Sequence, residues 1–154
     1  MMTAVADLTA NAERLWGQWR DWAVLEGIAV PADPAFAAIR EKVWEASDFV
    51  APTAPRDPPT FAGGALGRPA VRGQRDGGLA AALEGLSPQR ADDAELKRHL
   101  RRFRRREMLR IVWRDLGGIA SLDETLEDLS ELADACIRRA LDWTQAWCRA
   151  ELGL

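Results

Sequence analysis

The chain has 154 residues, of which 47% are hydrophobic and 29% charged, and its formal net charge is −3. This composition is typical of one globular domain and excludes an intrinsically disordered protein. The slightly acidic balance gives no reason to expect polyanion binding by the chain as a whole. Because Ala, Leu, Arg and Glu are abundant and β-branched residues are scarce, we expect an all-α protein.

The apolar pattern and the cysteines favour a cytoplasmic protein. No apolar run reaches the roughly 18 residues that read as a membrane span, and the N-terminus lacks the basic and apolar regions of a signal peptide. Cys136 and Cys148 fall on one predicted helix, where they would lie roughly 18 Å apart at ~1.5 Å per residue. That distance is too long for a disulfide, so we expect reduced thiols.

Two amphipathic helices are predicted for the first fifty residues. The first covers residues 7–26 and should end at Gly27. Its apolar residues recur at helical spacing: Leu8, Ala12, Leu15, Trp16, Trp19 and Trp22. The second begins at Asp33 and Pro34, an N-cap followed by proline at the first helical position. Its expected apolar face consists of Phe36, Ile39, Val43 and Ala46.

The chain changes character near residue 50. A short capped turn is expected where two polar residues precede two apolar ones: Ser47, Asp48, Phe49 and Val50. Residues 51–90 then hold six of the eight Pro and seven of the twelve Gly. We interpret them as a loop or partly disordered linker, with one short helix around Leu79–Leu86.

A long antiparallel helix hairpin is predicted for the rest of the chain, at about 92–116 and 121–152. Asp92 and Asp93 can cap its first helix, and Gly117 and Gly118 should end it. The apolar positions of this helix are Leu96, Leu100, Phe103, Met108, Leu109, Ile111, Val112, Trp113 and Leu116. Ser121 and Glu124 form a capping box for the second helix. Its expected apolar stripe is Leu122, Leu126, Leu129, Ala133, Cys136, Ala140, Thr144 and Trp147, flanked by Leu132, Ile137 and Leu141.

The charges of the two helices support the hairpin. Residues 97–114 carry nine Lys or Arg and one acid, whereas residues 122–151 carry eight acids and three Arg. Facing helices of opposite charge attract, although each exposed pair adds only ~0–1 kcal/mol. We therefore divide the chain into N-terminal helices (1–50), a Pro/Gly-rich loop or linker (51–90) and the hairpin (91–154), and expect an α-helical bundle.

No catalytic, cofactor-binding or metal-binding residues are predicted. The sequence has no Asp-x-Asp pair for two magnesium ions and no Gly-rich loop followed by Lys and Ser or Thr for phosphates. The glycine-rich run from Gly63 to Gly67 lacks that Lys, and we interpret it as a loop. The single His99 lies on a different predicted helix from both cysteines, which favours a surface or boundary histidine over a metal ligand.

Two features carry a candidate interaction face. The arginine cluster includes Arg101, Arg104, Arg105 and Arg106, whose guanidinium groups match phosphate oxygens in nucleic acids. The alternative, which we favour, is a charged helix face balanced by the acidic helix beside it. Trp16 and Trp19 could form either a docking face for another domain or part of the core, and we favour core packing.

The segment LRRFRRREMLRIVWRDL at Leu100–Leu116 resembles the helical signature of bacterial glutamine synthetase adenylyltransferase, also called the adenylyl-removing enzyme. The following helix fits the family pattern at Leu122, Thr125, Leu126, Asp128, Leu129, Ser130, Leu132, Ala133, Asp134, Ala135 and Trp143. Residues 46–50 (ASDFV) match a further element, which Arg56-Asp57-Pro58 continues. The resemblance covers residues 95–152 strongly and 36–58 weakly. The prolines and glycines after residue 51 depart from the helical sequence usual in the family.

The resemblance implies a function that depends on more than these residues. Family enzymes carry two nucleotidyltransferase domains, which add AMP to a glutamine synthetase tyrosine and remove it by phosphorolysis under control of a PII signalling protein and glutamine. ATP, ADP, phosphate and magnesium are implied for a downstream nucleotidyltransferase core, and none for the present residues. We therefore expect the N-terminal helical part of such an enzyme, on the deadenylylating side and inactive alone. The alternatives are a stand-alone helical protein-interaction module and, last, a nucleic-acid-binding protein.

Overall fold

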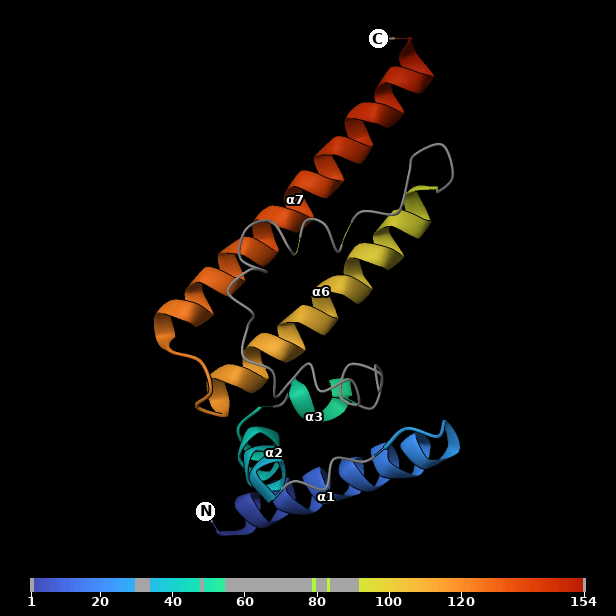
Figure 1. The fold of residues 1–154 in the computed structure, drawn as a ribbon. Helices are drawn as coiled ribbons and strands as arrows, with labels where there is room; N and C mark the ends of the chain where they lie inside the picture. Colours follow the sequence, from blue (N-terminus) through green and yellow to red (C-terminus); the bar gives the residue numbers. More distant parts are fainter. Residues whose placement is uncertain are drawn as a thin grey trace. The chain divides into compact units, whose positions relative to one another are not determined.

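The computed structural model describes residues 2–29, 34–47, 49–54, 79, 83 and 92–153. These residues form the helices α1 (Met2–Leu25), α2 (Pro34–Ala46), α3 (Val50–Thr53), α6 (Asp93–Leu116) and α7 (Leu122–Leu152), shown in Figure 1. The described part of the chain contains no strand, which confirms the predicted all-α class. None of its helices combines the length and apolar character needed to cross a bilayer.

Helix α1 ends where glycine was predicted to end it. Gly27 has φ +67°, a left-handed conformation that only glycine adopts without strain. The N–H of Gly27 donates to the carbonyl of Val24 at 3.2 Å, and the N–H of Ile28 donates to that of Ala23 at 2.8 Å. These two bonds form a Schellman motif, which satisfies carbonyl groups that the end of a helix leaves unpaired.

Helix α6 ends in the same way. Gly118 has φ +70°, and its N–H donates to the carbonyl of Asp115 at 3.0 Å. The N–H of Ile119 donates to the carbonyl of Arg114 at 2.8 Å, which completes the motif. At Gly117 a methyl group would lie 2.9 Å from Cγ2 of Ile39 and 2.6 Å from the Trp113 carbonyl oxygen. This turn therefore requires glycine at both positions, for different reasons.

The predicted helix caps are confirmed at two positions. Oδ1 of Asp92 accepts a hydrogen bond from the N–H of Glu95 at 2.6 Å, which fixes the start of α6. Oγ of Ser47 accepts from the N–H groups of Phe49 and Val50 at 3.3 and 3.2 Å, at the start of α3. Of the other expected caps, Asp33 and Asp48 lie outside the described residues, as does most of the loop predicted for residues 51–90, and the capping box of Ser121 and Glu124 stays a prediction.

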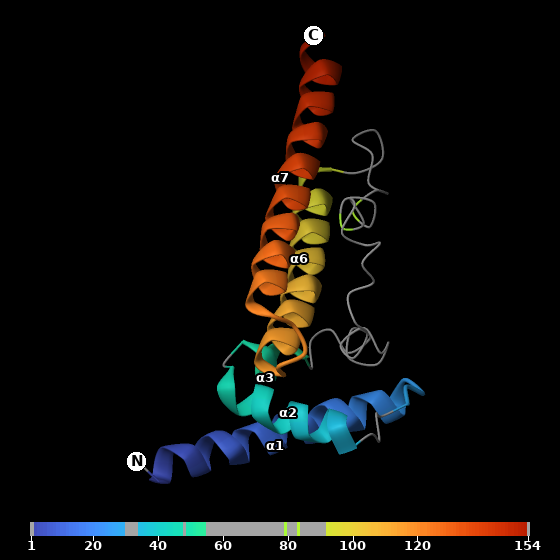
Figure 2. The ribbon, with the colours of Figure 1, turned by 60° about the vertical axis from the view of Figure 1, so that its left-hand side comes forward.

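The described residues fall into two compact units. The first contains α1, α2, α3 and residues 109–122, and the second contains α6 up to Met108 and residues 123–153 with Leu79 and Leu83. In the first unit, α2 and α3 both pack on α1 (Figure 2). Leu79 and Leu83 are helical and buried, in the segment where a short helix was predicted.

The core of the first unit is built around tryptophan. Its buried members are Ala12, Trp16, Trp19, Ala23, Val43, Trp44, Val50, Ala54, Leu109 and Trp113. Trp16 stacks on Trp19 with ring centroids 4.8 Å apart, and Trp113 contacts Phe36 at 5.2 Å and Trp44 at 6.5 Å. Each aromatic pair adds about 0.5–1.5 kcal/mol beyond the burial of its area.

The predicted faces of α1 and α2 are confirmed except at one position. Leu15, Trp22, Phe36 and Ile39 are partly buried against the core, but Ala46 is exposed. Val43 and Trp44 are both buried, which turns the buried arc of α2 toward Arg40 and away from Ala46. The side chain of Leu8 lies outside the described residues.

In the second unit, α6 and α7 run antiparallel in both views, as the hairpin prediction expects (Figures 1 and 2). The buried residues of α7 are Thr125, Asp128, Leu132, Ala135 and Trp143. The stripe predicted for this helix is wrong as a buried face, because Leu122, Leu126 and Trp147 are 69%, 54% and 43% exposed. Apolar residues cover a wide arc of α7, and only its edge at Leu132, Ala135 and Trp143 is buried.

Two glycine substitutions should distinguish the steric need for glycine at the turn after α6 from the general effect of glycine on helix propensity. Gly117→Ala should lower the free energy of unfolding by at least about 1–3 kcal/mol, because the added methyl group overlaps a backbone oxygen and Ile39. Gly17→Ala, in the middle of α1 with nothing within 4 Å of the new methyl group, should raise it by roughly 0.5–1 kcal/mol. Urea denaturation of both variants measures the difference, and equal effects would contradict it.

Candidate interaction surfaces

The described residues hold no metal-binding cluster. No three His, Cys, Asp or Glu side chains come together among them, so this part of the chain does not fit a magnesium site. Cys136 and Cys148 are free thiols on α7, and His99 is a half-buried residue of α6.

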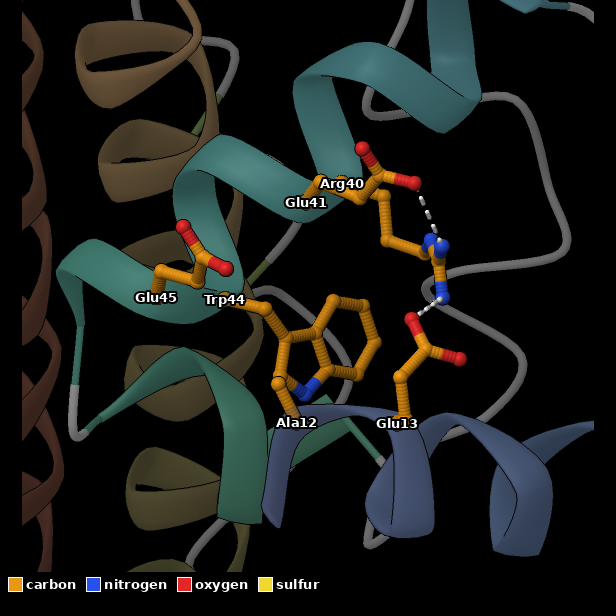
Figure 3. A pocket seen from close by; sticks show the side chains of 6 residues that line it. All are labelled: Ala12, Glu13, Arg40, Glu41, Trp44 and Glu45. Carbon is orange, nitrogen blue, oxygen red and sulfur yellow. Dashed lines mark hydrogen bonds and ion pairs between the residues drawn. The ribbon is translucent and has the colours of Figure 1, made fainter. Parts of the chain in front are cut away.

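An open pocket lies between α1 and α2 in the first unit (Figure 3). Its volume is about 330 Å³, and its lining consists of Ala12, Glu13, Arg40, Glu41, Trp44 and Glu45. Arg40 is 8% exposed, and its guanidinium lies 4.7 Å from the centre of the Trp16 ring. Nη1 of Arg40 lies 3.3 Å from Glu13 and Nη2 lies 3.4 Å from Glu41, as the dashed lines in Figure 3 mark.

The charges of this pocket disfavour a nucleotide. Three carboxylates line it, and the single guanidinium is engaged by two of them. A phosphate group would meet like charges here, which is unfavourable in a partly dehydrated site. The arrangement therefore serves to hold α2 on α1, because Arg40 combines an ion pair with a cation–π contact to a core tryptophan.

Replacing Arg40 should destabilise the first unit. Arg40→Met should lower the free energy of unfolding by about 1–2 kcal/mol, because it removes the cation–π contact and leaves two carboxylates without their cation. Glu13→Gln should cost at most ~0.5 kcal/mol, since Glu13 is 57% exposed and its ion pair is screened by water. Arg20→Met, at an exposed position of α1, is the matched control and should change nothing in the same urea titration.

Trp16 and Trp19, which were candidates for a docking face, belong to the core. Trp19 is fully buried and Trp16 is 9% exposed. Both rings are engaged by each other, and Trp16 also contacts Phe36 and Trp44. They offer a partner almost no surface, so their placement agrees with the core-packing interpretation.

The arginine cluster of α6 is exposed. Arg106 is tied to its neighbours, since its Nε donates to Glu107 at 3.1 Å and its guanidinium lies 5.3 Å from the Phe103 ring centre. Arg101, Arg104 and Arg105 make no ion pair or hydrogen bond with any described residue. The expected direct pairing with the acidic helix is therefore not found for these three arginines.

Two exposed ion pairs of α6 and α7 lie within single helices. Lys97 binds Asp93 at 2.7 Å on α6, and Arg138 binds Asp134 at 3.4 Å on α7. Both are exposed pairs one helical turn apart, which stabilise their own helix by only about 0.3–0.5 kcal/mol. The sequence alone cannot distinguish ion pairs within one helix from ion pairs between the two helices of the hairpin, because both use the same residue types.

The thiol of Cys136 has a shifted pKa. Burial raises the pKa of its thiol above the ordinary value of 9.0, and the positive charge of Arg104 partly opposes that rise. The thiol stays protonated at neutral pH and is a poor nucleophile.

The shift predicts a pH dependence of stability. A thiol whose pKa is higher in the folded state leaves stability unchanged below pH 9 and reduces it as pH rises further, because the unfolded chain ionises first. The difference in unfolding free energy between the wild type and Cys136→Ala should therefore be constant from pH 6 to about 8 and shrink above about pH 9. A constant difference up to pH 10.5, measured by urea titration, would contradict the shift.

Comparison with known sequences decides the family. The sequence pattern of glutamate-ammonia ligase adenylyltransferase matches residues 39–154, which include all of α6 and α7. The chain belongs to this family. No solved structure matches it.

The relatives are much longer than this chain. A bifunctional glutamine synthetase adenylyltransferase/adenylyl-removing enzyme from Thioalkalivibrio sulfidiphilus is 40% identical over 134 residues, which are 84% of this chain and 13% of that protein. Proteins of the same name from Pseudomonas aeruginosa and Pseudomonas syringae pv. tomato are 48% identical over 106 residues and 42% over 145 residues. These matches cover 66% and 92% of this chain, and 10% and 13% of those proteins. The chain thus spans about an eighth of the length of such relatives.

The sequence did not reveal the role of Arg40. A signal was present, because Arg40 stands four residues after Phe36 and three before Val43, on the apolar face of α2. A lone cation on such a face indicates a buried or bridging role, since long charged side chains are seldom fully buried without a partner.

Proposed function

We propose that this chain is the N-terminal helical part of a bifunctional glutamine synthetase adenylyltransferase/adenylyl-removing enzyme. The observation that carries the proposal is the family match over residues 39–154, together with relatives of that name that are 40–48% identical. Its role would be to support the nucleotidyltransferase core on the deadenylylating side. That core would come from the remaining part of the enzyme, which makes up most of the length of these relatives.

A supporting role agrees with the chemistry that the residues offer. Phosphoryl and nucleotidyl transfer needs metal ions and positioned phosphates. The sequence has no Asp-x-Asp pair, the described residues form no three-ligand cluster, and the pocket at Arg40 has an excess of carboxylates. ATP, ADP, phosphate and magnesium would therefore bind the catalytic core, and this chain would contribute stable helices beside it.

The partners and the compartment follow from the same proposal. Glutamine synthetase is the substrate that the names of the relatives give, and it would be the protein on which the complete enzyme acts. A PII signalling protein would regulate it, as the family resemblance implies. These proteins of nitrogen assimilation would meet in the cytoplasm.

A chimaeric enzyme tests the proposal. The matching 106-residue stretch of the Pseudomonas aeruginosa relative would be replaced by the corresponding residues of this chain. Adenylylation and deadenylylation of glutamine synthetase should both persist within about tenfold of the parent enzyme, because the exchanged helices keep the same packing faces. The isolated chain, assayed with magnesium, ATP and phosphate, should show no turnover.

The control for this experiment targets the core. Trp113→Ala in the chimaera should cost about 3–5 kcal/mol of stability, since Trp113 is 1% exposed and contacts two aromatic rings, and activity should fall with it. A chimaera that folds, by circular dichroism and gel filtration, but has lost both activities would overturn the proposal. Turnover by the isolated chain would overturn the assignment of catalysis to the remaining part.

A stand-alone interaction module is the second candidate. The observation that favours it is the row of exposed apolar side chains on α7, among them Ile137 at 65% and Leu141 at 53%. A chain that acts only by binding would leave such a row free for its partner.

A further inference from the structure

Helix α7 has a second apolar side that the described residues leave largely exposed. Its members follow one another at intervals of four and seven residues, which places them along one side of the helix: Leu126, Ala133, Ile137, Leu141, Cys148 and Leu152. The four large aliphatic side chains among them are 53–65% exposed. At ~1.5 Å per residue this apolar stripe is roughly 39 Å long, so it follows nearly the whole helix.

The stripe is separate from the side of α7 that is buried in the second unit. That side carries Leu132, Ala135 and Trp143. The half-buried Leu129 and Cys136 lie between the two sides, so the apolar surface continues from one to the other. A helix at the surface of a finished domain has polar residues opposite its buried face, whereas a helix that is apolar over a wide arc packs against neighbours on more than one side. The composition of α7 therefore indicates a second packing partner.

The length of the relatives indicates where that partner comes from. The chain spans 13% of the relatives from Thioalkalivibrio sulfidiphilus and Pseudomonas syringae pv. tomato, so most of the complete enzyme of the proposed function is further polypeptide. Consecutive elements of a chain lie next to each other in space more often than not. Leu152 is both the last residue of α7 and the last member of the stripe. A segment that follows α7 in the complete enzyme can therefore fold back along the stripe after a short turn.

We propose that the segment following α7 in the complete enzyme packs along this apolar stripe. The inference rests on the proposed function, because that function makes the chain the N-terminal part of a longer polypeptide. An occupant from the same polypeptide needs no diffusional encounter, so burial of the aliphatic side chains holds it without charged contacts. The stripe is thus an internal contact of the complete enzyme, and α7 is packed on two sides.

Cys148 is a native probe of the stripe. Its thiol is free and half-buried, and it stands seven residues after Leu141 on the same side of α7. Trypsin cleaves after Arg139 and Arg149, so mass spectrometry of the peptides resolves Cys148 from Cys136. The rate of alkylation by N-ethylmaleimide is measured in the isolated 154-residue chain and in a chimaera that is folded by circular dichroism. In the chimaera, this chain replaces the stretch of the Pseudomonas syringae relative that matches it over 145 residues.

The thiol should be protected only where the occupant is present. Cys148 should react at least about tenfold more slowly in the chimaera than in the isolated chain, because the packed segment covers it. Leu141→Glu should return the rate in the chimaera to within about threefold of the isolated chain, because a charge without a partner cannot be buried in this contact. In the isolated chain the same substitution should change the rate by less than about twofold, since Leu141 is already 53% exposed there.

The matched control moves the thiol off the stripe. In the double variant Cys148→Ser/Arg149→Cys the probe lies one residue further on, about 100° around the helix at 3.6 residues per turn, at an exposed position. Its rate of alkylation should be the same, within about twofold, in the isolated chain and in the chimaera.

An equal rate at Cys148 in the isolated chain and in the folded chimaera would overturn the inference. Equal protection of the thiol at position 149 would also overturn it, because the cover would then not follow the apolar side of α7. Protection in the isolated chain that grows with protein concentration, together with dimers in gel filtration, would assign the stripe to a second copy of the chain. The proposed function fails separately, since a folded chimaera that protects Cys148 but has no activity would support this contact and overturn the enzymatic role.

Discussion

The contact on which the first unit depends is the meeting of tryptophans from three segments of the chain. Trp16 of α1, Trp44 of α2 and Trp113 of α6 come within ring-contact distance in a connected series, and Phe36 joins it. These residues are far apart in sequence, so the cluster defines which helices belong together. Because flat rings of this size pack in few ways, it also fixes the rotation of each helix about its own axis.

The turn after α6 imposes a second constraint on the same core. Trp113 lies in the cluster one turn before α6 ends, and Gly117 allows Ile39 of α2 to approach the backbone closely at that point. Ile119, which donates the last bond of the Schellman motif, is itself packed against the core. Backbone geometry, helix termination and core packing thus meet within seven residues.

The sequence was sufficient to predict the helices but not the way each is rotated. Gly27, Gly118 and Asp92 mark their helix ends through local backbone chemistry, which involves only neighbouring residues, and those predictions are confirmed. The wide apolar arc of α7 was ambiguous for the opposite reason. Periodicity shows that Leu126 and Leu132 are both on an apolar side, but which of them is buried depends on the partner helix.

For the candidate surfaces too, features set by residues near in sequence were predictable, and features set by another helix were not. The number of arginines on α6 made their exposure predictable. The absence of cross-helix ion pairs for Arg101 and Arg104 was not predictable, because an acid can pair equally well with a basic residue four positions away on its own helix. Arg40 was overlooked since its partners Glu13 and Trp16 come from another helix. Family membership is shown by sequence similarity, which reflects common ancestry. A physical argument from composition could not have identified the family.

The stacked indoles of Trp16 and Trp19 have an optical consequence. Their rings are 4.8 Å apart and inclined by only 7°, so their electronic transitions must couple and absorb as a pair. Five of the seven tryptophans lie in the first unit, and the second holds only the buried Trp143 and the exposed Trp147. The near-ultraviolet circular dichroism of the protein should therefore report mainly on the packing of the first unit. Quenching of tryptophan fluorescence by a dissolved quencher should instead report on the exposed Trp147 of the second unit.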